Sequence, residues 1–192
     1  AGVHAYNQTA NFLIDKKIND IQKTLYALNS MLPRTITIKS IKPINIDFHS
    51  RYSAISREYI YQMTLRNISI CQKYYHKLNY RLDFKIIDEF IKIVIGRNSF
   101  KSLCKNSEDK HNFFCDMKEI EYKINKKKET IIFRLLCDRY LHSMVRALLG
   151  TFVDLGRERL NLEETISKFK NGEKIRATYL PANALFLNKI NY

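Results

Sequence analysis

The sequence predicts an α+β fold in which helices flank an antiparallel sheet. Hydrophobic residues make up 45% of the 192 residues, which is enough apolar material to bury a core. Residues 113–124 and 130–138 are predicted to be two strands joined by the charged turn Asn125–Glu129, which is compatible with a β-hairpin. Residues 140–155 instead repeat apolar residues every three or four positions, as in a packed helix. Because helix and strand patterns are mixed along the chain without strict alternation, an antiparallel sheet is favoured.

The remaining elements follow from the same two periodicities. In chain order we expect a helix over 15–31, strands over 35–41 and 53–65, a loop over 66–82, a helix over 84–95, a loop over 97–112, a helix from 161 to about 172 and a final strand over 182–192. Asp83 and Asn161 are suited to cap their helices, and Gly96 and Gly156 to end theirs.

The charge balance is the strongest signal in the composition. Lys and Arg number 33 against 19 Asp and Glu, which gives a net charge of +14 and a pI near 9.6. An AT-rich genome raises the Lys content but still encodes Asp and Glu readily, so it leaves the deficit of acids unexplained. A basic surface that binds a polyanion is therefore favoured, either nucleic acid or an anionic membrane surface.

Cysteine and histidine give no sign of a metal site. The cysteines lie far apart in the sequence, at Cys71, Cys104, Cys115 and Cys137, without a Cys-x-x-Cys pair. The five histidines are also dispersed, and neither Gly-x-Gly-x-x-Gly nor Gly-x-x-x-x-Gly-Lys occurs. We therefore expect no metal site, and because no export signal is visible we expect a reduced cytosolic protein.

The strand 53–65 carries the first candidate for RNA chemistry. Arg57, Tyr59 and Tyr61 fall on one face by the two-residue period. Aromatic rings beside a guanidinium can stack an unpaired base and hold its phosphate. From composition alone, two tyrosines on a half-buried sheet remain the simpler interpretation.

Two further candidates lie elsewhere in the chain. His142 and Arg146 are four residues apart and share a face of the predicted helix 140–155. An arginine on the flank of a buried helix is costly unless its guanidinium meets a carboxylate or a phosphate. The simpler interpretation is an arginine whose aliphatic stem lies along the surface while its guanidinium stays in water. Arg51 could contact phosphate from a turn that precedes the tyrosine strand, and Lys126–Lys128 is most simply a solvated turn.

The segments that hold these candidates resemble the tRNA pseudouridine synthase A family. The resemblance rests on blocks that appear in family order along the whole chain. These blocks are Ala1–Ala5 with Gln8 and Phe12, Ala27–Pro33, Asp47–Ala54, Arg57–Tyr61, Arg139–Arg146 with Gly150, Thr151, Gly156 and Arg157, and Pro181–Ala182 with Leu185. Departures from the family pattern occur at Ser143, Ala147 and Ala184.

The resemblance implies an isomerase that acts on tRNA. The family converts uridine to pseudouridine at positions 38, 39 and 40 of the anticodon stem and loop, as a homodimer without a cofactor. Its fold places RNA in a basic cleft between two lobes, so residues 1–52 would be the remainder of the N-terminal lobe and residues 53–192 the C-terminal lobe. The target base must leave the stack before it can react.

The resemblance also implies roles for individual residues. Tyr59 would pack against the flipped uracil and assist proton removal, and Arg146 would pair with the catalytic aspartate and keep it ionised. Arg57, Arg51 and His142 would bind substrate. The nucleophilic aspartate belongs to a Gly-Arg-Thr-Asp motif that we expect immediately before Ala1.

This placement of the nucleophile leads to the expectation of a truncated chain that does not isomerise uridine alone. Asp15, Asp20 and Asp47 lie outside the family motif and are not expected to substitute for it. The main alternative is a non-catalytic remnant that still binds tRNA. A second alternative is a basic protein that docks on an anionic membrane, although no basic amphipathic helix stands out.

Overall fold

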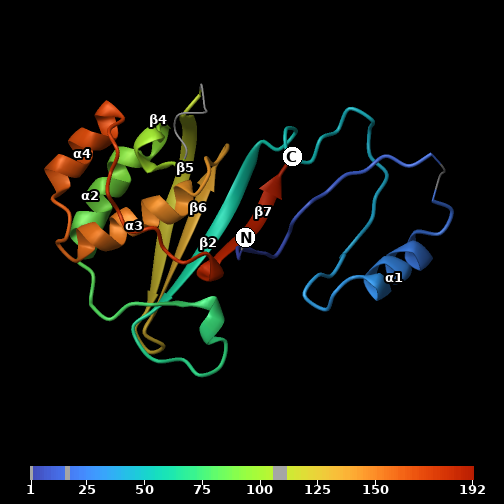
Figure 1. Ribbon diagram of the computed structural model, residues 1–192, viewed down its shortest axis with the longest axis horizontal. Helices are drawn as coiled ribbons and strands as arrows, with labels where there is room; N and C mark the ends of the chain where they lie inside the picture. The colour runs from blue at the N-terminus through green and yellow to red at the C-terminus, as the bar shows by residue number, and fades with distance from the viewer. Residues whose placement is uncertain (1, 16–17, 106–111) are drawn as a thin grey trace. The chain divides into compact units, whose positions relative to one another are not determined.

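The computed structural model describes residues 2–15, 18–105 and 112–192, which fall into two compact units (Figure 1). The residues up to Gln8 together with Ala54–Tyr192 form one unit, and Thr9–Ser53 form the other. The predicted division at residue 52 into parts of two enzyme lobes stays a prediction.

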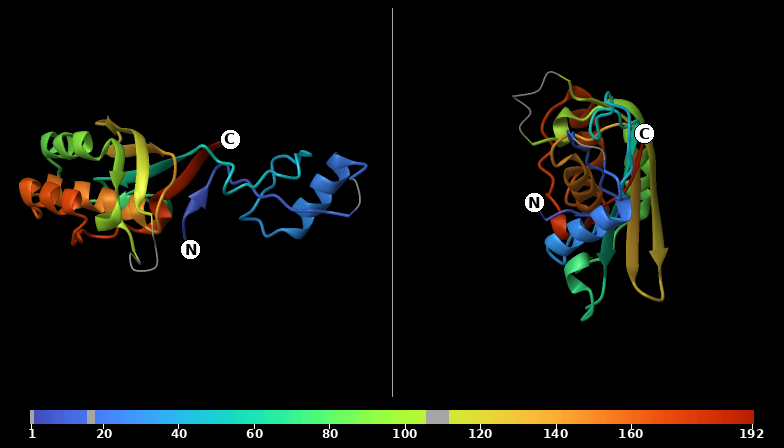
Figure 2. Two further views of the ribbon diagram at one scale, coloured as in Figure 1. Left: turned by 90° about the horizontal axis from the view of Figure 1, so that it is seen from above. Right: turned by 90° about the vertical axis from the view of Figure 1, so that its right-hand side faces the viewer.

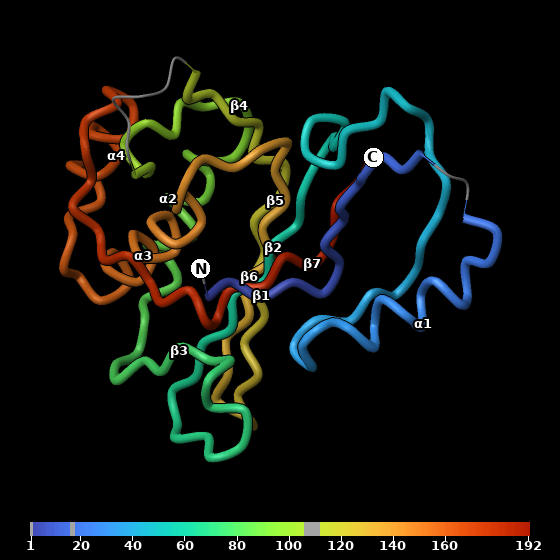
Figure 3. The backbone as a smooth tube through the Cα atoms, turned by 45° about the vertical axis from the view of Figure 1, so that its right-hand side comes forward, coloured from blue at the N-terminus to red at the C-terminus, as the bar shows by residue number. Residues whose placement is uncertain are grey.

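A mixed sheet forms the centre of the larger unit. Its strands in the described part of the chain are β1 (His4–Ala5), β2 (Ser56–Thr64), β3 (His76–Lys77), β4 (Gly96–Ser99), β5 (Phe114–Asn125), β6 (Thr130–Cys137) and β7 (Leu185–Asn191). The order is β1-β7-β2-β6-β5-β4, with β3 paired to the end of β2. Figure 3 shows β7 running beside β1 at this edge. The α+β class is confirmed, but the sheet is not purely antiparallel, because β1–β7 and β2–β3 are parallel pairs.

Three helices cover one face of this sheet (Figures 1 and 2). They are α2 (Phe84–Val94), α3 (Met144–Gly156) and α4 (Leu162–Asn171). Tyr61 and Phe133 point from the sheet into the core, where they meet Phe90 and Phe152 from the helices, and all four are fully buried. Burial of such aromatic side chains contributes about 2 kcal/mol each and fixes the helices on the sheet.

The predicted helix caps are confirmed. The Asp83 carboxylate accepts the Lys85 N–H at 2.8 Å, and the Asn161 side chain accepts the Glu164 N–H at 3.0 Å. Gly96 follows the end of α2 with a φ of 89°, a conformation that favours glycine. The hairpin of β5 and β6 is also confirmed, and so are the second helix, the last helix and the last strand.

The predicted strand 35–41 is wrong. Its alternating Thr and Ile residues form no strand, because the Asn29 side chain takes the place of a neighbouring strand. That side chain accepts the Ile38 N–H at 2.8 Å and donates to the Ile38 carbonyl at 3.0 Å. Ile36 is 53% exposed, so the alternating apolar side chains gain no stability from a buried face.

Several element boundaries also differ from the prediction. The helix expected at 140–155 begins only at Met144, because Ser143 has a left-handed φ of 61°. The expected loops contain short elements, namely β3, β4 and the 3₁₀ turns η1 (Gln72–Tyr74) and η2 (Lys101–Leu103), and a third turn, η3 (Ala182–Ala184), precedes β7. Residues 106–111 of the loop 97–112 lie outside the described residues.

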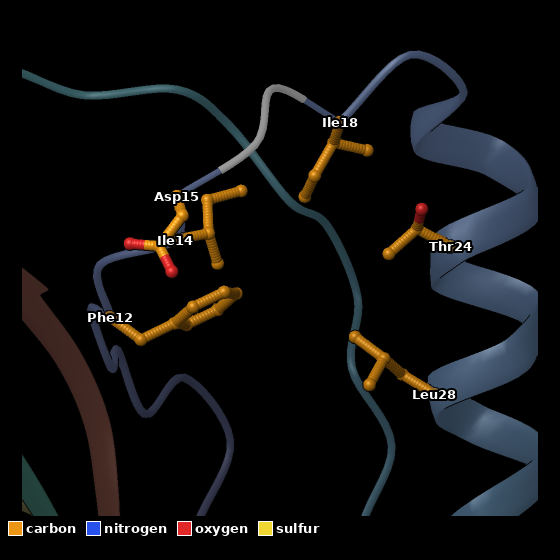
Figure 4. A pocket seen from close by; sticks show the side chains of 6 residues that line it. All are labelled: Phe12, Ile14, Asp15, Ile18, Thr24 and Leu28. Atoms are coloured by element: carbon orange, nitrogen blue, oxygen red, sulfur yellow. The ribbon is translucent and has the colours of Figure 1, made fainter.

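The smaller unit contains one helix among its described residues, α1 (Ile21–Met31). The Asp20 carboxylate caps it by accepting the Lys23 N–H at 2.9 Å, so the helix begins later than the predicted residue 15. A mainly apolar hollow of about 490 Å³ lies beside this helix. Figure 4 shows the side chains that line it. Phe12, Ile14, Asp15, Ile18, Thr24 and Leu28 line it.

Candidate functional site

Arg146 is the one residue of α3 that is not buried. Its half-buried guanidinium is fixed because Nε donates a hydrogen bond to the Leu180 carbonyl oxygen. The Leu180 N–H in turn donates to the Arg146 carbonyl at 3.3 Å. Within residues 2–15, 18–105 and 112–192, no carboxylate forms an ion pair with Arg146. A partly desolvated cation is therefore held in place with capacity to bind an anion.

Two tyrosines lie within electrostatic reach of this guanidinium. Burial raises the pKa of Tyr61 far above its usual value, and the positive charge of Arg146 opposes that rise. Burial also raises the pKa of Tyr179, helped by the nearby Cys104 thiol and opposed by Arg146. The Tyr61 hydroxyl donates to the Pro181 carbonyl at 3.0 Å. Both phenols are neutral hydrogen-bond donors at neutral pH.

Tyr59 is half-buried and lies two residues from Tyr61 on the same face of β2. Its ring meets the Tyr140 ring edge-on, with 5.0 Å between the centroids and 87° between the planes. The Tyr140 hydroxyl donates to the Leu135 carbonyl at 2.9 Å, which fixes that ring. Burial raises the pKa of Tyr59, and the charge of Arg57 opposes the rise. A rigid aromatic surface therefore stands roughly 7 Å along β2 from Tyr61.

The other predicted site residues of the larger unit lie around this group. Arg57 Nη1 donates to the Asp138 carbonyl at 3.4 Å, at the end of β6. His142 is exposed, and its carbonyl accepts the Lys105 N–H at 3.1 Å. His142 lies in the turn before α3, so its predicted placement on one helical face with Arg146 is wrong. The left-handed Ser143 separates the two residues.

Arg51 belongs to the smaller unit and is described there alone. Its N–H donates to His49 Nδ1 at 3.1 Å, and its guanidinium lies 5.5 Å from the centre of the Tyr52 ring. The Tyr52 N–H also donates to His49 Nδ1, at 3.3 Å. Nδ1 of His49 is therefore an acceptor with a structural role. Asp20 caps α1 and Asp15 lines the hollow, so both have local positions within this unit.

Exposed basic residues gather at one end of the sheet. Residues 66–82 contain four Lys and Arg residues and no Asp or Glu. Lys77 pairs with Thr64 and Thr64 with Thr130, which brings this segment beside the turn that holds Lys126–Lys128. The exposed members are Arg66, Lys73, Lys77, Arg81, Lys126, Lys127 and Lys128, and we call them the basic end.

Sequence reasoning missed the contacts of the segment before β7. Leu180 and Pro181 lie more than thirty positions from Arg146 and Tyr61, and no local periodicity reports such contacts. Two signals were present within α3 itself, namely a glycine at position 150 and a charged Asp154 in an otherwise apolar stretch. Among the described residues, no group of three His, Cys, Asp or Glu side chains could hold a metal ion.

Comparisons with known proteins agree with this arrangement. A family model described as tRNA pseudouridine synthase matches residues 90–192, which include α3 and β7. A tRNA pseudouridine synthase A from Parabacteroides distasonis is 31% identical over 193 residues, covering 100% of this chain and 76% of the relative. Enzymes of the same name from Borrelia garinii and Brachyspira hyodysenteriae are 34% and 33% identical, and cover 100% and 98% of this chain and 78% and 77% of themselves.

Proposed function

The chain belongs to the tRNA pseudouridine synthase A family, and we propose that it isomerises uridine at positions 38, 39 and 40 of the tRNA anticodon stem and loop. The observation that carries this proposal is Arg146, a fixed and half-buried cation without a carboxylate partner among the described residues. Removal of a charge from water is costly unless an opposite charge compensates it. The site is therefore suited to receive a carboxylate.

We propose that this carboxylate is the aspartate of the family's Gly-Arg-Thr-Asp motif. We propose that this motif directly precedes Ala1, because Ala1–Ala5 with Gln8 and Phe12 resemble the family block that follows it. An arginine within a few ångströms lowers the pKa of a carboxyl group and orients it, so the aspartate would be an ionised nucleophile at neutral pH. Isomerisation by residues 1–192 would then require this aspartate, whereas tRNA binding would not.

The proposed reaction needs no cofactor because its atoms and electrons balance internally. One oxygen of the aspartate attacks C1′ and bonds to it, while the bond between N1 and C1′ breaks and its electron pair leaves with the uracil. After the base turns, C5 attacks C1′, and the bond between C1′ and the aspartate oxygen breaks, which releases the carboxylate. The proton on C5 is then lost while N1 gains one. Arg146 keeps the aspartate ionised before the attack.

Tyr59 is proposed to hold the extruded uracil. Its ring is braced edge-on by Tyr140, so it offers a pre-formed face for stacking. Its raised pKa keeps the hydroxyl protonated at rest, so it can donate a hydrogen bond to the base. Assistance with removal of the C5 proton would follow only once the base is bound.

The phosphate backbone of tRNA is proposed to bind the cationic surface. The basic end supplies seven exposed positive side chains, and Arg57 and His142 are proposed to add contacts nearer the reacting uridine. Arg51 of the smaller unit is proposed to bind tRNA as well. Such contacts release counterions, so the logarithm of the affinity should fall steeply with the logarithm of the salt concentration. The same observation favours the second candidate function, a tRNA-binding protein without chemistry.

One experiment separates the two candidates. Unmodified tRNA is incubated with residues 1–192 and, in parallel, with the protein extended through the Gly-Arg-Thr-Asp motif. We expect salt-dependent binding by both and pseudouridine only with the extended protein. Pseudouridine formed by residues 1–192 alone would overturn the assignment of the nucleophile. Binding without pseudouridine in either protein would favour the non-catalytic function.

We further propose a cytoplasmic homodimer. Among the described residues, no helix has the length and apolarity that a membrane crossing requires. Sedimentation of the extended protein should give twice the mass of the chain, and a monomeric mass would remove the dimer from the proposal. Binding to anionic vesicles in preference to tRNA would instead favour a membrane-surface protein.

A further inference from the structure

A short segment before β7 lies against α3, and we call Thr178–Pro181 the strap. In Figure 1 this red part of the chain crosses α3 before it enters β7. At Gly150 the approach is so close that an added Cβ would stand 1.6 Å from the Thr178 carbonyl oxygen. A glycine at this position is therefore required for the strap to lie where it does.

Asp154 fastens the N-terminal end of the strap. One Asp154 oxygen accepts the Thr178 N–H at 2.8 Å, and the other accepts the Thr178 hydroxyl at 3.4 Å. The carboxylate is fully buried, and the guanidinium of Arg157 neutralises it at 2.8 Å. Arg159 adds a weaker ion pair at 3.6 Å and donates to the Thr178 hydroxyl at 3.0 Å.

The carboxylate is poorly placed for the helix itself. Asp154 lies in the last turn of α3, where the helix dipole disfavours a negative charge. Its backbone carbonyl already orders the following turn by accepting the N–H groups of Arg159 and Leu160. The carboxylate is therefore not needed to order that turn. Its hydrogen bonds and ion pairs are instead with Thr178 of the strap and with the two arginines.

The C-terminal end of the strap holds the site. The Leu180 carbonyl accepts Arg146 Nε, and the Leu180 N–H donates to the Arg146 backbone. Pro181 accepts the Tyr61 hydroxyl at 3.0 Å. A continuous chain of contacts therefore runs from the Asp154 carboxylate through Thr178 and Leu180 to the guanidinium of Arg146.

We propose that Asp154 is a positioning residue that fixes the Arg146 guanidinium through the strap. Without its carboxylate, the Thr178 N–H loses its acceptor and the strap lifts from α3. The Leu180 carbonyl then no longer orients Arg146 Nε toward the place where the nucleophilic carboxylate must stand. This inference rests on the proposed function, since its consequence for turnover requires the isomerase reaction.

The test compares Asp154→Asn with Val153→Ala, a matched control that removes buried volume from the same turn. Asn keeps one acceptor oxygen but carries an amide N–H₂ in place of the other, so it cannot accept from the Thr178 N–H and from the Arg157 guanidinium at the same time. In residues 1–192, the ¹H–¹⁵N signal of Arg146 Nε reports its hydrogen bond independently of any reaction, and Arg146→Lys identifies it by removal. We expect exchange of this proton with water to rise at least about tenfold in Asp154→Asn and to stay unchanged in Val153→Ala.

The second readout is turnover by the extended protein. We expect Asp154→Asn to lower kcat about tenfold or more while KM stays within about twofold, because orientation and not binding is lost. Gly150→Ala provides a second variant, which displaces the strap although Ala favours a helix interior. It should reproduce both effects, and it decides the test if Asp154→Asn does not fold.

The outcomes separate this inference from the proposed function. Unchanged protection of Arg146 Nε in Asp154→Asn would overturn the positioning role, whatever the activity. An equal loss of kcat in Val153→Ala would also overturn it, since a general loss of packing would then explain the effect. Absence of turnover in the unsubstituted extended protein would instead overturn the proposed function, while the exchange measurement still tests the strap.

Discussion

Removal of the hydroxyl alone is predicted to lower the free energy of unfolding at Tyr61 and to lower turnover at Tyr59. Tyr61→Phe removes a buried donor to the Pro181 carbonyl, a bond of 3.0 Å between neutral groups. Pro181 is itself exposed, so water can replace the lost donor. The loss in free energy of unfolding is therefore about 1 kcal/mol, the net contribution of one hydrogen bond. It does not reach the larger cost of leaving a buried polar group without a partner.

The pH dependence of this effect has a defined sign. Burial raises the pKa of Tyr61 far above the value near 10 that a tyrosine has in an unfolded chain. The protonated hydroxyl therefore contributes its full stability below pH 10. Above that pH the unfolded chain ionises first, and the contribution is progressively lost. The difference between the parent protein and Tyr61→Phe should shrink as the pH rises past 10.

Urea unfolding at pH 7 and above pH 10 measures both quantities. Tyr59→Phe is the matched control, because no hydrogen bond of its hydroxyl connects it to another described residue. We expect it to change the free energy of unfolding by less than about 0.5 kcal/mol and to lower turnover by the extended protein. A loss above about 2 kcal/mol for Tyr61→Phe, or equal losses for both variants, would refute the reasoning.

Three further predictions concern charges away from the strap. Arg134→Ala should lower the free energy of unfolding by about 1 kcal/mol, because it breaks three ion pairs of 2.8–2.9 Å and only the pair with Glu58 is well shielded from water. Urea unfolding should show that this cost falls as the salt concentration rises. The cost should also fall at acid pH, where Glu58, whose pKa is lowered in the folded protein, becomes protonated. Asp83→Ala should cost about 1 kcal/mol in the same assay by removing the cap of α2, and an unchanged midpoint would contradict that role. Reversal of Lys126–Lys128 to Glu should weaken tRNA binding and reduce its salt slope by about 2, whereas Lys85→Glu with Lys92→Glu on α2 should change the slope little.

The elements that the sequence predicted well are those with strong local patterns. The strands β5 and β6 are joined by a short charged turn, and α2 and α4 are preceded by side chains that cap them. Residues 35–41 alternate equally well but form no strand. The decisive interaction there, between Asn29 and Ile38, is a side-chain bond that replaces a strand partner and leaves no periodic signal.

The residues of the candidate site stay a prediction from the sequence, and the contacts that hold Arg146 and Tyr61 in place were not predicted. Aromatic and cationic residues on β2 and α3 were visible in the sequence, and the resemblance selected Tyr59 and Arg146 among them. The contacts of Arg146 and Tyr61 depend on the strap, which reaches α3 from a position more than twenty residues beyond the end of that helix. Contacts at such separations have no local period, so only the fold reveals them. Within α3, Gly150 and Asp154 interrupt the apolar pattern, and both prove to contact Thr178 of the strap.

The role of Arg146 as partner of the nucleophilic aspartate is the central claim, and substitution of this residue tests it most directly. Pseudouridine formation and tRNA affinity are measured for the extended protein and for its Arg146→Ala variant. We expect pseudouridine at positions 38, 39 and 40 in the unsubstituted protein, and a loss of turnover of about a hundredfold or more in the variant. The affinity for tRNA should change by less than about fivefold, since Arg146 is proposed to bind the aspartate and the phosphate contacts of the basic end remain. Near-normal turnover in Arg146→Ala would contradict the account.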